Sequence, residues 1–481
     1  MRHAAVAPII VPVPNPPGIA VVGAGFCGVV GAIELLRSNL PAGTRVLLIE
    51  RPGHGIGGQA YDVASERVLL NVRAERMSAF AQVPDDFANY LAAAHPAGDA
   101  ASFAPRHYYG RYLATRLDMA AFREGSRAVL EPIAAEVIDV RRHATGRREI
   151  LADAGVRRVS LFADAVLLAT GASLPLPPRW LQPWMLGEAR YVDAWSRLAT
   201  TAGAIETVVA IGSGVSFVDL VVELRAGGFR GRIVAISRHG MLPRPEERAT
   251  PPPEPDDLPA EITSARPPAA RGLMRALVHH AGALAERGRD YRSMLAALRR
   301  HSMRLWAELG HLERARFPRH ARALWDVHRH RMPEAAERLI AAELQAGTLE
   351  IVAGRVRSVG RSARGLTLAV EPRGRASTVP PEAGRIVNCT GAPAGAPLGD
   401  PSPALLGRGS AQRDPLGLGV LTDPSGCLID AGGRAQPGLY CAGPLWRGQE
   451  WEITAVAELR VRLPTVAAAI AAGVVRPGVL A

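Results

Sequence analysis

Two glycine-rich turns carry the clearest chemical signal in the sequence. The first lies in "IAVVGAGFCG", where Gly23, Gly25 and Gly28 follow an apolar strand and open an apolar helix. Glycines in this G-x-G-x-x-G spacing let the phosphates of a dinucleotide approach backbone amides at a helix N-terminus. The next strand, "RVLLIE", ends in Glu50, whose carboxylate can bind ribose hydroxyls and would repel a 2′-phosphate. We therefore expect FAD or NAD at this turn, and not NADP.

The second turn, in "VVAIGSGVSFVDLVVEL", repeats the opening and then departs from it. The "GSG" of residues 212–214 is in place, but Phe217 replaces the third glycine. Because that glycine serves helix packing more than phosphate contact, we expect a second, looser nucleotide site. Phe217 would push the helix outward or lie sideways against the sheet. The next strand ends in "SRHG" without an acid, so Arg238 favours NADPH over NADH. A degenerate repeat that keeps only the fold is the alternative.

The elements around the two turns follow one plan. Buried strands that end in small-residue turns close both halves, as "ADAVLLATG" and "GRIVNCTG", and antiparallel strands precede them near 137–140 and 352–359. The predicted fold class is α/β, with two Rossmann-like dinucleotide-binding domains, for FAD and for NAD(P)H, and a helical insertion in the second. The predicted boundaries are a flexible tail over 1–17, an FAD-binding domain over 18–200 and 371–481, and an NAD(P)H-binding domain over 201–370 with its insertion at 258–345.

Composition excludes several classes of protein. The chain has 481 residues, 48% of them apolar, with no run of 18 apolar residues free of charge, so we expect no membrane span and a cytoplasmic location. All 57 basic residues are arginine, which excludes lysine Schiff-base and P-loop chemistry. Residues 261–340 hold 16 arginines against 8 acids. We interpret this excess as a solvated helical face and expect no nucleic-acid partner, because aromatic residues are not interleaved with the arginines.

Neither the cysteines nor the histidines are spaced for a metal or a redox disulfide. The four cysteines form no C-x-x-C pair, so a disulfide beside a flavin is not expected. In "WDVHRHRMP", His328 and His330 alternate and would fall on different faces of a helix, which argues against a shared metal. They would instead line a polar cleft or pair with acids, and Arg329 and Arg331 could clamp an anionic group.

The motifs together resemble a known family. The segments "GAGFCG", "GGQAYD", "LLNVRAERMSAF", "RHYYGRYL", "LLATG", "GSGVSFVD", "SRHGMLPRP", "WDVHRHRMP" and "GLYCAGPLWRGQEWEITAVAELR" are similar to those of bacterial FAD/NAD(P)-binding proteins, relatives of two-Rossmann-domain flavin monooxygenases. Some members are amino-acid N-monooxygenases, including enzymes that oxidise the amine of aspartate towards nitrosuccinate. The chain departs from the family at Arg73 and Ala457, where relatives often have proline.

The resemblance and the turns together imply three groups of site residues. The first group would bind FAD, with residues 443–454 beside its isoalloxazine ring and a helix from near Ile453 aimed at it: Gly23, Gly25, Phe26, Cys27, Gly28, Glu50, Arg51, Val137, Thr170, Gly171, Gly443, Pro444, Trp451 and Ile453. The second would bind NADPH, with NADH possible: Gly212, Ser213, Gly214, Ser216, Arg238, Thr390 and Gly391. The third would face the substrate: Tyr61, Asn71, Arg73, His328, Arg329, His330 and Arg331.

The leading hypothesis is an FAD-dependent monooxygenase that consumes NADPH and dioxygen. It would hydroxylate the nitrogen of a small amino acid, acidic ones included, or of an amine through a flavin hydroperoxide, chemistry that the cofactor supplies. No separate catalytic side chain is assigned. The first alternative is an NAD(P)H-dependent flavin reductase or dehydrogenase that passes electrons to a quinone or a partner protein. The second is a non-catalytic nucleotide-binding regulator whose second site Phe217 has disabled.

Overall fold

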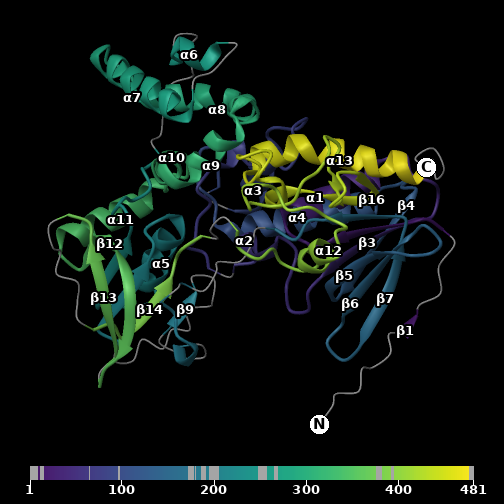
Figure 1. The fold of residues 1–481 in the computed structure, drawn as a ribbon, viewed down its shortest axis with the longest axis horizontal. Coiled ribbons are helices and arrows are strands. Elements are labelled where there is room, and N and C mark those ends of the chain that lie inside the picture. The colour runs from purple at the N-terminus through teal and green to yellow at the C-terminus, as the bar shows by residue number, and fades with distance from the viewer. Residues whose placement is uncertain are drawn as a thin grey trace.

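The computed structural model of the chain (Figure 1) describes residues 9–10, 16–63, 65–95, 98–171, 178, 180–185, 191–193, 205–246, 257–264, 269–363, 365–374, 382–391 and 395–475. Two lobes each hold a six-stranded sheet, and α6, α7 and α8 stand apart from both sheets, at the top of the view. Among these residues no helix is both long and apolar enough to span a membrane. The architecture is α/β with two Rossmann-like domains, as predicted.

The first domain is built on a sheet of strand order β15-β16-β8-β2-β3-β4. Five neighbouring pairs include four parallel ones, and β15 pairs with β16 antiparallel. A second sheet, β1-β7-β6-β5, covers one face. The elements of this domain are β1 (Ile9–Ile10), β2 (Gly18–Val22), α1 (Phe26–Arg37), β3 (Thr44–Glu50), α2 (Gly58–Tyr61), η1 (Ala74–Arg76), α3 (Asp86–Ala94), α4 (Arg106–Ala121), β4 (Ala128–Ala134), β5 (Glu136–Arg142), β6 (Arg148–Asp153), β7 (Arg158–Ala163), β8 (Ala165–Leu168), α12 (Ser402–Gly407), β15 (Cys427–Ile429), β16 (Ala435–Cys441), η4 (Gly443–Trp446) and α13 (Val456–Val475).

Alternation along β2 explains the layers of this domain. Every residue of "GIAVV" is buried, as expected for a central parallel strand covered on both faces. Ile19 and Val21 point into a core shared with α1, α4 and α13, whereas Ala20 and Val22 point into a core shared with β5 and β6. The first face is therefore covered by helices and the second by the small antiparallel sheet.

The second domain repeats this plan on a sheet of order β13-β12-β11-β10-β14-β9. Val208 and Ala210 of the central strand face α5 and α11, and Val209 and Ile211 face the opposite core. Its elements are β9 (Tyr191–Asp193), β10 (Thr207–Ile211), α5 (Val215–Ala226), β11 (Arg232–Ser237), α11 (Glu334–Gln345), β12 (Leu349–Arg361), β13 (Leu366–Pro372) and β14 (Arg385–Asn388), and the 3-10 turn η2 (Pro183–Met185) packs beside it.

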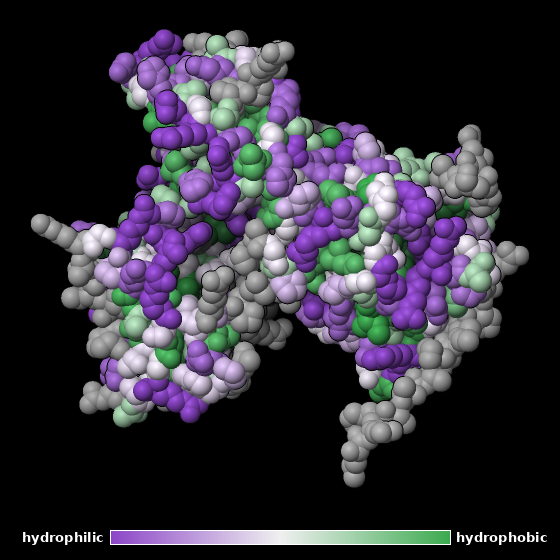
Figure 2. Space-filling model, viewed as in Figure 1, coloured by the Kyte–Doolittle hydropathy of each residue, from purple (hydrophilic) through white to green (hydrophobic). Residues whose placement is uncertain are grey.

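The helical insertion leaves the second domain after β11 and packs around its own apolar core. Its helices are α6 (Ala260–Thr263), α7 (Ala270–Glu286), α8 (Tyr291–Glu308), α9 (His311–His320) and α10 (Arg322–Arg329). Trp306 of α8 lies in this core together with Trp451, which belongs to the first domain. Arg271 and Arg275 are exposed on α7, and hydrophilic residues cover much of the insertion on the face seen in Figure 2.

Strand pairing moves three of the predicted boundaries. β14 pairs parallel with β10, and β9 pairs with β14, so both belong to the second domain, which reaches from 191 to 391 and not from 201 to 370. α11 was predicted within the insertion, but it packs on α5 as the crossover helix that parallel β11 and β12 require. In the predicted flexible tail, Ile9–Ile10 pairs with β7, whereas residues 1–8 and 11–15 lie outside the described residues.

Candidate functional site

The first glycine turn joins β2 to α1. One side of the turn is packed against protein atoms, and the other side has free space. Gly23 has a φ of 100°, and its amide donates to the Ile49 carbonyl at 2.8 Å. A Cβ atom on Gly28 would lie 1.8 Å from the Gly23 carbonyl oxygen, so only glycine fits there. At Gly25 a Cβ atom would have no neighbour within 4 Å. The open side therefore lies at the start of α1, where backbone amides can bind phosphate.

Glu50 ends β3 directly beside this turn. Its Oε2 accepts a hydrogen bond from the Ala24 amide at 2.6 Å, and its Oε1 accepts one from the Arg51 amide at 2.9 Å. The Arg51 side chain is exposed, with its Nε 3.9 Å from Glu50 Oε1. Two backbone donors thus hold the Glu50 carboxylate at the edge of the turn, and its binding of a ribose stays a prediction. Val137 of β5 is buried in the core behind it.

A second pair of glycines lies against the first turn and was not among the predicted site residues. The Gly57 amide donates to the Ala24 carbonyl at 2.9 Å, and a Cβ atom on Gly58 would lie 3.0 Å from the Gly25 Cα. Both glycines have a positive φ, of 107° and 60°. The signal was available in "GGQAYD", a motif that carries the resemblance but was not assigned to the site.

The closing strand and the C-terminal segment complete the surroundings of this turn. Thr170, after β8, has a buried Oγ1 without a hydrogen-bond partner, and such an atom can receive a ligand. A Cβ atom on Gly443 would lie 2.7 Å from the Cys27 Sγ, so Gly443 and Pro444 begin η4 against the start of α1. Burial raises the pKa of the Cys27 thiol to about 12, which keeps it protonated as a packing group.

Two of the three residues predicted to face a substrate from this domain, Tyr61 and Arg73, contact different aromatic rings. Tyr61 ends α2, with its ring centroid 4.6 Å from that of Tyr109, and burial raises its pKa to about 12. Arg73 lies over the Phe103 ring at 4.7 Å and donates to the Ala101 carbonyl. Asn71 is half-buried in the loop between them. Their role towards a substrate stays a prediction.

The second turn has the same backbone as the first. Gly212 has a φ of 104°, and its amide donates to the Ile236 carbonyl at 2.8 Å. A Cβ atom on Gly214 would meet nothing within 4 Å, so the side that would face phosphate is open here too. Phe217 is fully buried in the core with Val208 and Ile340. α5 therefore begins far enough from its turn to admit the Cβ that α1 excludes at Gly28.

Side chains tie the second turn more tightly than the first. Ser213 Oγ donates to the Met241 carbonyl at 2.6 Å and lies 2.8 Å from the Ser237 Oγ at the end of β11. Thr390, the counterpart of Thr170, donates to Asn388 Oδ1 at 2.6 Å. Ser216 is half-buried on α5 and stays a predicted contact.

A group of basic residues lies just beyond Ser237. Arg238 is exposed, and Arg373 of the loop after β13 contacts the His239 ring. Burial lowers the pKa of His239, and the positive charges of Arg373, Arg238 and Arg355 lower it further. This concentration of arginine at a strand end suits a phosphate monoester. Sequence reasoning found Arg238 but missed Arg355 and Arg373, which lie more than a hundred residues further along the chain.

Helix α10 joins the insertion to the C-terminal segment through Glu452. Its Oε1 accepts from Trp325 Nε1 at 2.8 Å, and its Oε2 accepts from Arg329 Nε at 2.8 Å. Arg331 binds Glu246 at 2.9 Å. Arg329 and Arg331 therefore both bind carboxylates of the protein, although an anionic ligand was predicted for them. Ile453 is buried beside Glu452, and α13 begins three residues later than predicted, at Val456.

His328 lies in α10 and His330 directly after it, and the two side chains have different surroundings. The His328 ring lies 5.4 Å from the Tyr291 ring, and burial, with Arg244, Arg331 and Arg292 nearby, lowers its pKa. Burial also lowers the pKa of His330, and the Arg329 charge adds to this effect. Among the residues that the structure describes, no three His, Cys, Asp or Glu side chains gather as a metal site would need.

Two arginines, Arg322 and Arg447, lie over the ring of Trp451, and Arg322 also lies near the end of β14. The Arg447 guanidinium lies over the Trp451 ring at 4.2 Å, and that of Arg322 lies at 5.9 Å from the same ring. A Cβ atom on Gly391, at the end of β14, would lie 3.8 Å from Arg322 Nη2. Burial lowers the pKa of Arg447 to about 10, and the charge of Arg322 adds to this. The end of the second sheet and the C-terminal segment of the first domain thus meet at α10.

Comparison with known proteins agrees with these features. Residues 20–173 match a family described as FAD-NAD(P)-binding. The match covers about a third of the chain and lies within the first domain. The cofactor class predicted for the first domain is thereby confirmed. No curated protein matches the sequence.

Solved structures resemble the chain over nearly its whole length. The ornithine hydroxylase PvdA from Pseudomonas aeruginosa is 14% identical, with a TM-score of 0.62 over 96% of this chain and 99% of that chain. The ornithine N-hydroxylase KtzI of Kutzneria sp. 744, with reduced FAD, NADP+ and L-ornithine, is 15% identical, with a TM-score of 0.60 over 94% and 98%. The thioredoxin reductase of Lactococcus lactis is 12% identical, with a TM-score of 0.52 over 96% and 99%. At these identities the likeness shows a shared two-domain fold.

Proposed function

We propose that this protein is an FAD-dependent, NADPH-consuming monooxygenase that hydroxylates the nitrogen of a small amine. The observation that carries the proposal is the pair of open glycine turns, one ended by Glu50 and one by Arg238, in domains that meet at α10. There Arg322 reaches both Gly391 of the second domain and Trp451 of the first. A hydride donor and a flavin held in the two turns would be brought together at this junction.

The residues around the first turn fit FAD. The open space at Gly25 and the unpartnered Thr170 hydroxyl are features that a bound pyrophosphate and ribitol chain would use. When bound, FAD would supply both the acceptance of electrons and the activation of dioxygen. Glu50 would then hold a ribose, and the segment from Gly443 to Trp451 would cover the reactive end and exclude water.

The residues around the second turn fit NADPH better than NADH. Ser237 replaces the acid that would repel a 2′-phosphate, and Arg238, Arg355 and Arg373 surround His239 beside it. The site residues assigned to both cofactors, a small-molecule amine and dioxygen as partners, and a cytoplasmic location remain predictions of this proposal.

The described likenesses support N-hydroxylation over electron transfer to a disulfide or quinone. Two of the similar structures are ornithine hydroxylases, and one of these holds reduced FAD, NADP+ and an amine substrate. A thioredoxin reductase shares the fold, but all four cysteines of this chain are buried and unbonded. A reductase or dehydrogenase is the second candidate, because the fold alone serves both reactions.

The test is a balance of products. The purified flavoprotein is reduced anaerobically with NADPH and then mixed with oxygenated buffer and a panel of primary amines. Hydroxylated amine formed in proportion to the NADPH consumed would support the proposal. Flavin reduction with only hydrogen peroxide or reduced quinone as product, whichever amine is present, would favour the reductase. A bound flavin that NADPH never reduces would favour the regulator.

A further inference from the structure

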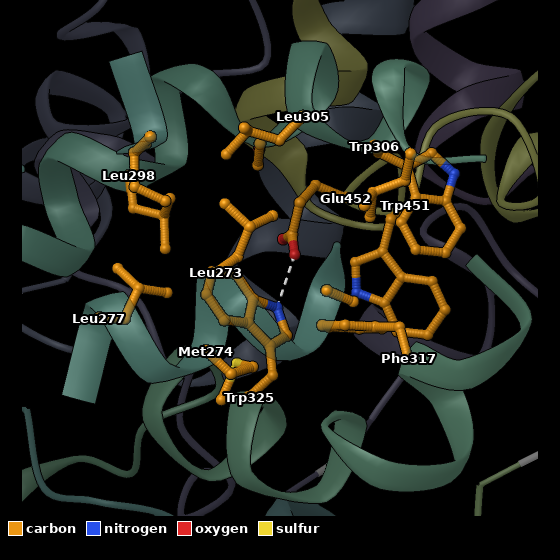
Figure 3. A pocket seen from close by; sticks show the side chains of 14 residues that line it. Leu273, Met274, Leu277, Leu298, Leu305, Trp306, Phe317, Trp325, Trp451 and Glu452 are labelled. Carbon is orange, nitrogen blue, oxygen red and sulfur yellow. Dashed lines mark hydrogen bonds between the residues drawn. The ribbon is translucent and has the colours of Figure 1, made fainter. Parts of the chain in front are cut away.

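The helical insertion encloses an apolar cavity that the two nucleotide turns do not use. Figure 3 shows leucine side chains of α7 and α8, among them Leu273, Leu277 and Leu298, facing the rings of Trp306, Trp325 and Trp451. The space between the lining side chains is about 590 Å³, its open mouth included. Because this figure includes the open solvent at the mouth, the enclosed part is smaller and suits a short apolar group rather than a large ligand.

The walls of the cavity are almost free of polar groups that a ligand could bind. Glu452 is the one carboxylate among the lining residues, and both of its oxygens are already bound, by Trp325 Nε1 and Arg329 Nε. Trp306 Nε1 donates to the Gly448 carbonyl at 3.0 Å and is turned away from a ligand. A charged or strongly polar group would lose its hydration there without replacement, whereas a hydrocarbon group would not.

The position of the cavity connects it with the junction of the two domains. Trp451, with its ring centroid 5.1 Å from those of Trp306 and Phe317, forms the wall on the side of the first domain. The same segment of chain begins at Gly443, where a Cβ atom would lie 2.7 Å from the Cys27 Sγ at the first glycine turn. The insertion therefore packs on the segment that is predicted to lie beside a flavin.

We propose that this cavity binds the apolar part of the substrate, a hydrocarbon chain or ring attached to the amine. That the ligand carries an amine rests on the proposed function. That it carries an apolar part rests on the cavity alone. The substrate class is then an apolar amine, and not the small acidic amino acid that the sequence suggested. The amine end would extend past Trp451 towards the junction at α10.

A series of ligands that differ by single methylene groups tests the apolar part directly. Calorimetry with the oxidised flavoprotein measures Kd for n-alkylamines and n-alkanols from three to eight carbons. Each methylene buried in the cavity should tighten binding about fourfold, until the cavity is full. The alkanols carry no oxidisable nitrogen, so their binding reports on the cavity whether or not the protein is a monooxygenase.

Leu277 of α7 lets the cavity be changed in both directions. Leu277→Trp should weaken the binding of the longest ligands by about tenfold or more, because the ring occupies their space. Leu277→Ala should extend the series by one or two further methylene groups that still tighten binding. Val278, 64% exposed on the same helix, gives the matched controls, because Val278→Trp and Val278→Ala should leave the whole series unchanged.

The outcomes separate the two proposals. Chain-length dependence in both series that moves with Leu277 and not with Val278 supports the cavity, even where no amine is oxidised and the proposed function fails. Oxidation of small amines without any chain-length dependence supports the function and overturns the cavity. Chain-length dependence that Val278 variants change as much as Leu277 variants also overturns it, because binding would then be to the surface of α7.

Discussion

The two glycine turns of this chain have nearly the same backbone but different surroundings. Gly23 and Gly212 share a φ near 100°, and both face the carbonyl of the closing strand, at 2.6 and 2.8 Å from a hypothetical Cβ atom. The third position differs, because Gly28 is closed by its turn and Phe217 fills a core. The first two glycines therefore define the open turn, whereas the third residue sets how closely the helix packs.

The side chains at the edges of the turns differ in a systematic way. At the strand end, Glu50 accepts two backbone hydrogen bonds, whereas Ser237 is bound by Ser213 and followed by an arginine group. The first turn keeps an unpartnered hydroxyl at Thr170, whereas Thr390 is bound by Asn388. The two turns therefore differ at their edges and not in their backbones, and the proposed difference in ligand preference rests on those edges.

Exchanging the third residues should have the largest effect. Gly28→Phe places a Cβ 1.8 Å from the Gly23 carbonyl, so we expect a loss of unfolding free energy above about 4 kcal/mol. Phe217→Gly should lose roughly 4 kcal/mol through the cavity it leaves, and should not improve NADPH binding. Thermal unfolding measures both. Tighter NADPH binding in Phe217→Gly would show that Phe217 obstructs the second site.

The second glycines should separate binding from folding. Because no atom lies near their Cβ positions, Gly25→Val and Gly214→Val should unfold within about 0.5 kcal/mol of the parent apoprotein. Gly25→Val should lose FAD affinity by roughly a hundredfold, equivalent to about 2.7 kcal/mol. Gly214→Val should keep FAD and slow its reduction by NADPH. Flavin absorbance after gel filtration checks the first; a yellow Gly25→Val protein would place FAD elsewhere.

The arginine group should discriminate the two nicotinamide cofactors. Arg238→Ala and Arg373→Ala should each raise KM for NADPH by roughly tenfold to thirtyfold and leave KM for NADH unchanged, through loss of a charge-assisted bond to the 2′-phosphate. Arg51→Ala, the equivalent change beside Glu50, is the control and should alter neither value. Equal effects on NADPH and NADH would remove the 2′-phosphate from this site.

Asp219 on α5 should show its effect only when the pH is changed. Its counterpart on α1 is Val30, and burial raises its pKa from 3.8 to about 6, although Arg106 at 2.9 Å opposes this. The folded chain therefore holds a proton that the unfolded chain releases, so this contribution is complete below pH 3.8 and lost as the pH rises through 6. Relative to Asp219→Asn, the parent should lose about 2 kcal/mol between pH 4 and 7.

Denaturant unfolding at each pH measures this difference. Asp86 provides a control with a shift in the opposite direction. Burial raises its pKa, but hydrogen bonds from Arg116 and Tyr112 outweigh this, so that the pKa is lowered. Its contribution should be present at neutral pH and lost as the pH falls below its ordinary pKa. A flat difference between Asp219→Asn and the parent would mean that Arg106 fully compensates the buried charge.

Sequence reasoning reached local features and missed those that depend on distant contacts. The turns, the acid at Glu50 and the two-domain plan were predictable because each lies within one strand-turn-helix segment. Membership of β14 was not assigned correctly, because it depends on pairing with β10 about 175 residues earlier. The partner of Arg329 could not be found, because Glu452 lies 123 residues away. The spacing of residues within one segment does not indicate which distant segment it will contact.

The insertion also has a mechanical consequence. Its chain leaves and re-enters the second domain, yet Arg299 binds Glu458 at 2.6 Å and Arg329 binds Glu452 at 2.8 Å, both in the first domain. Rotation of one domain against the other would have to break both pairs and withdraw Trp306 from Trp451. The insertion therefore opposes rotation of the two domains against each other. The two nucleotides would then meet through local rearrangement of side chains while the domains keep their relative orientation.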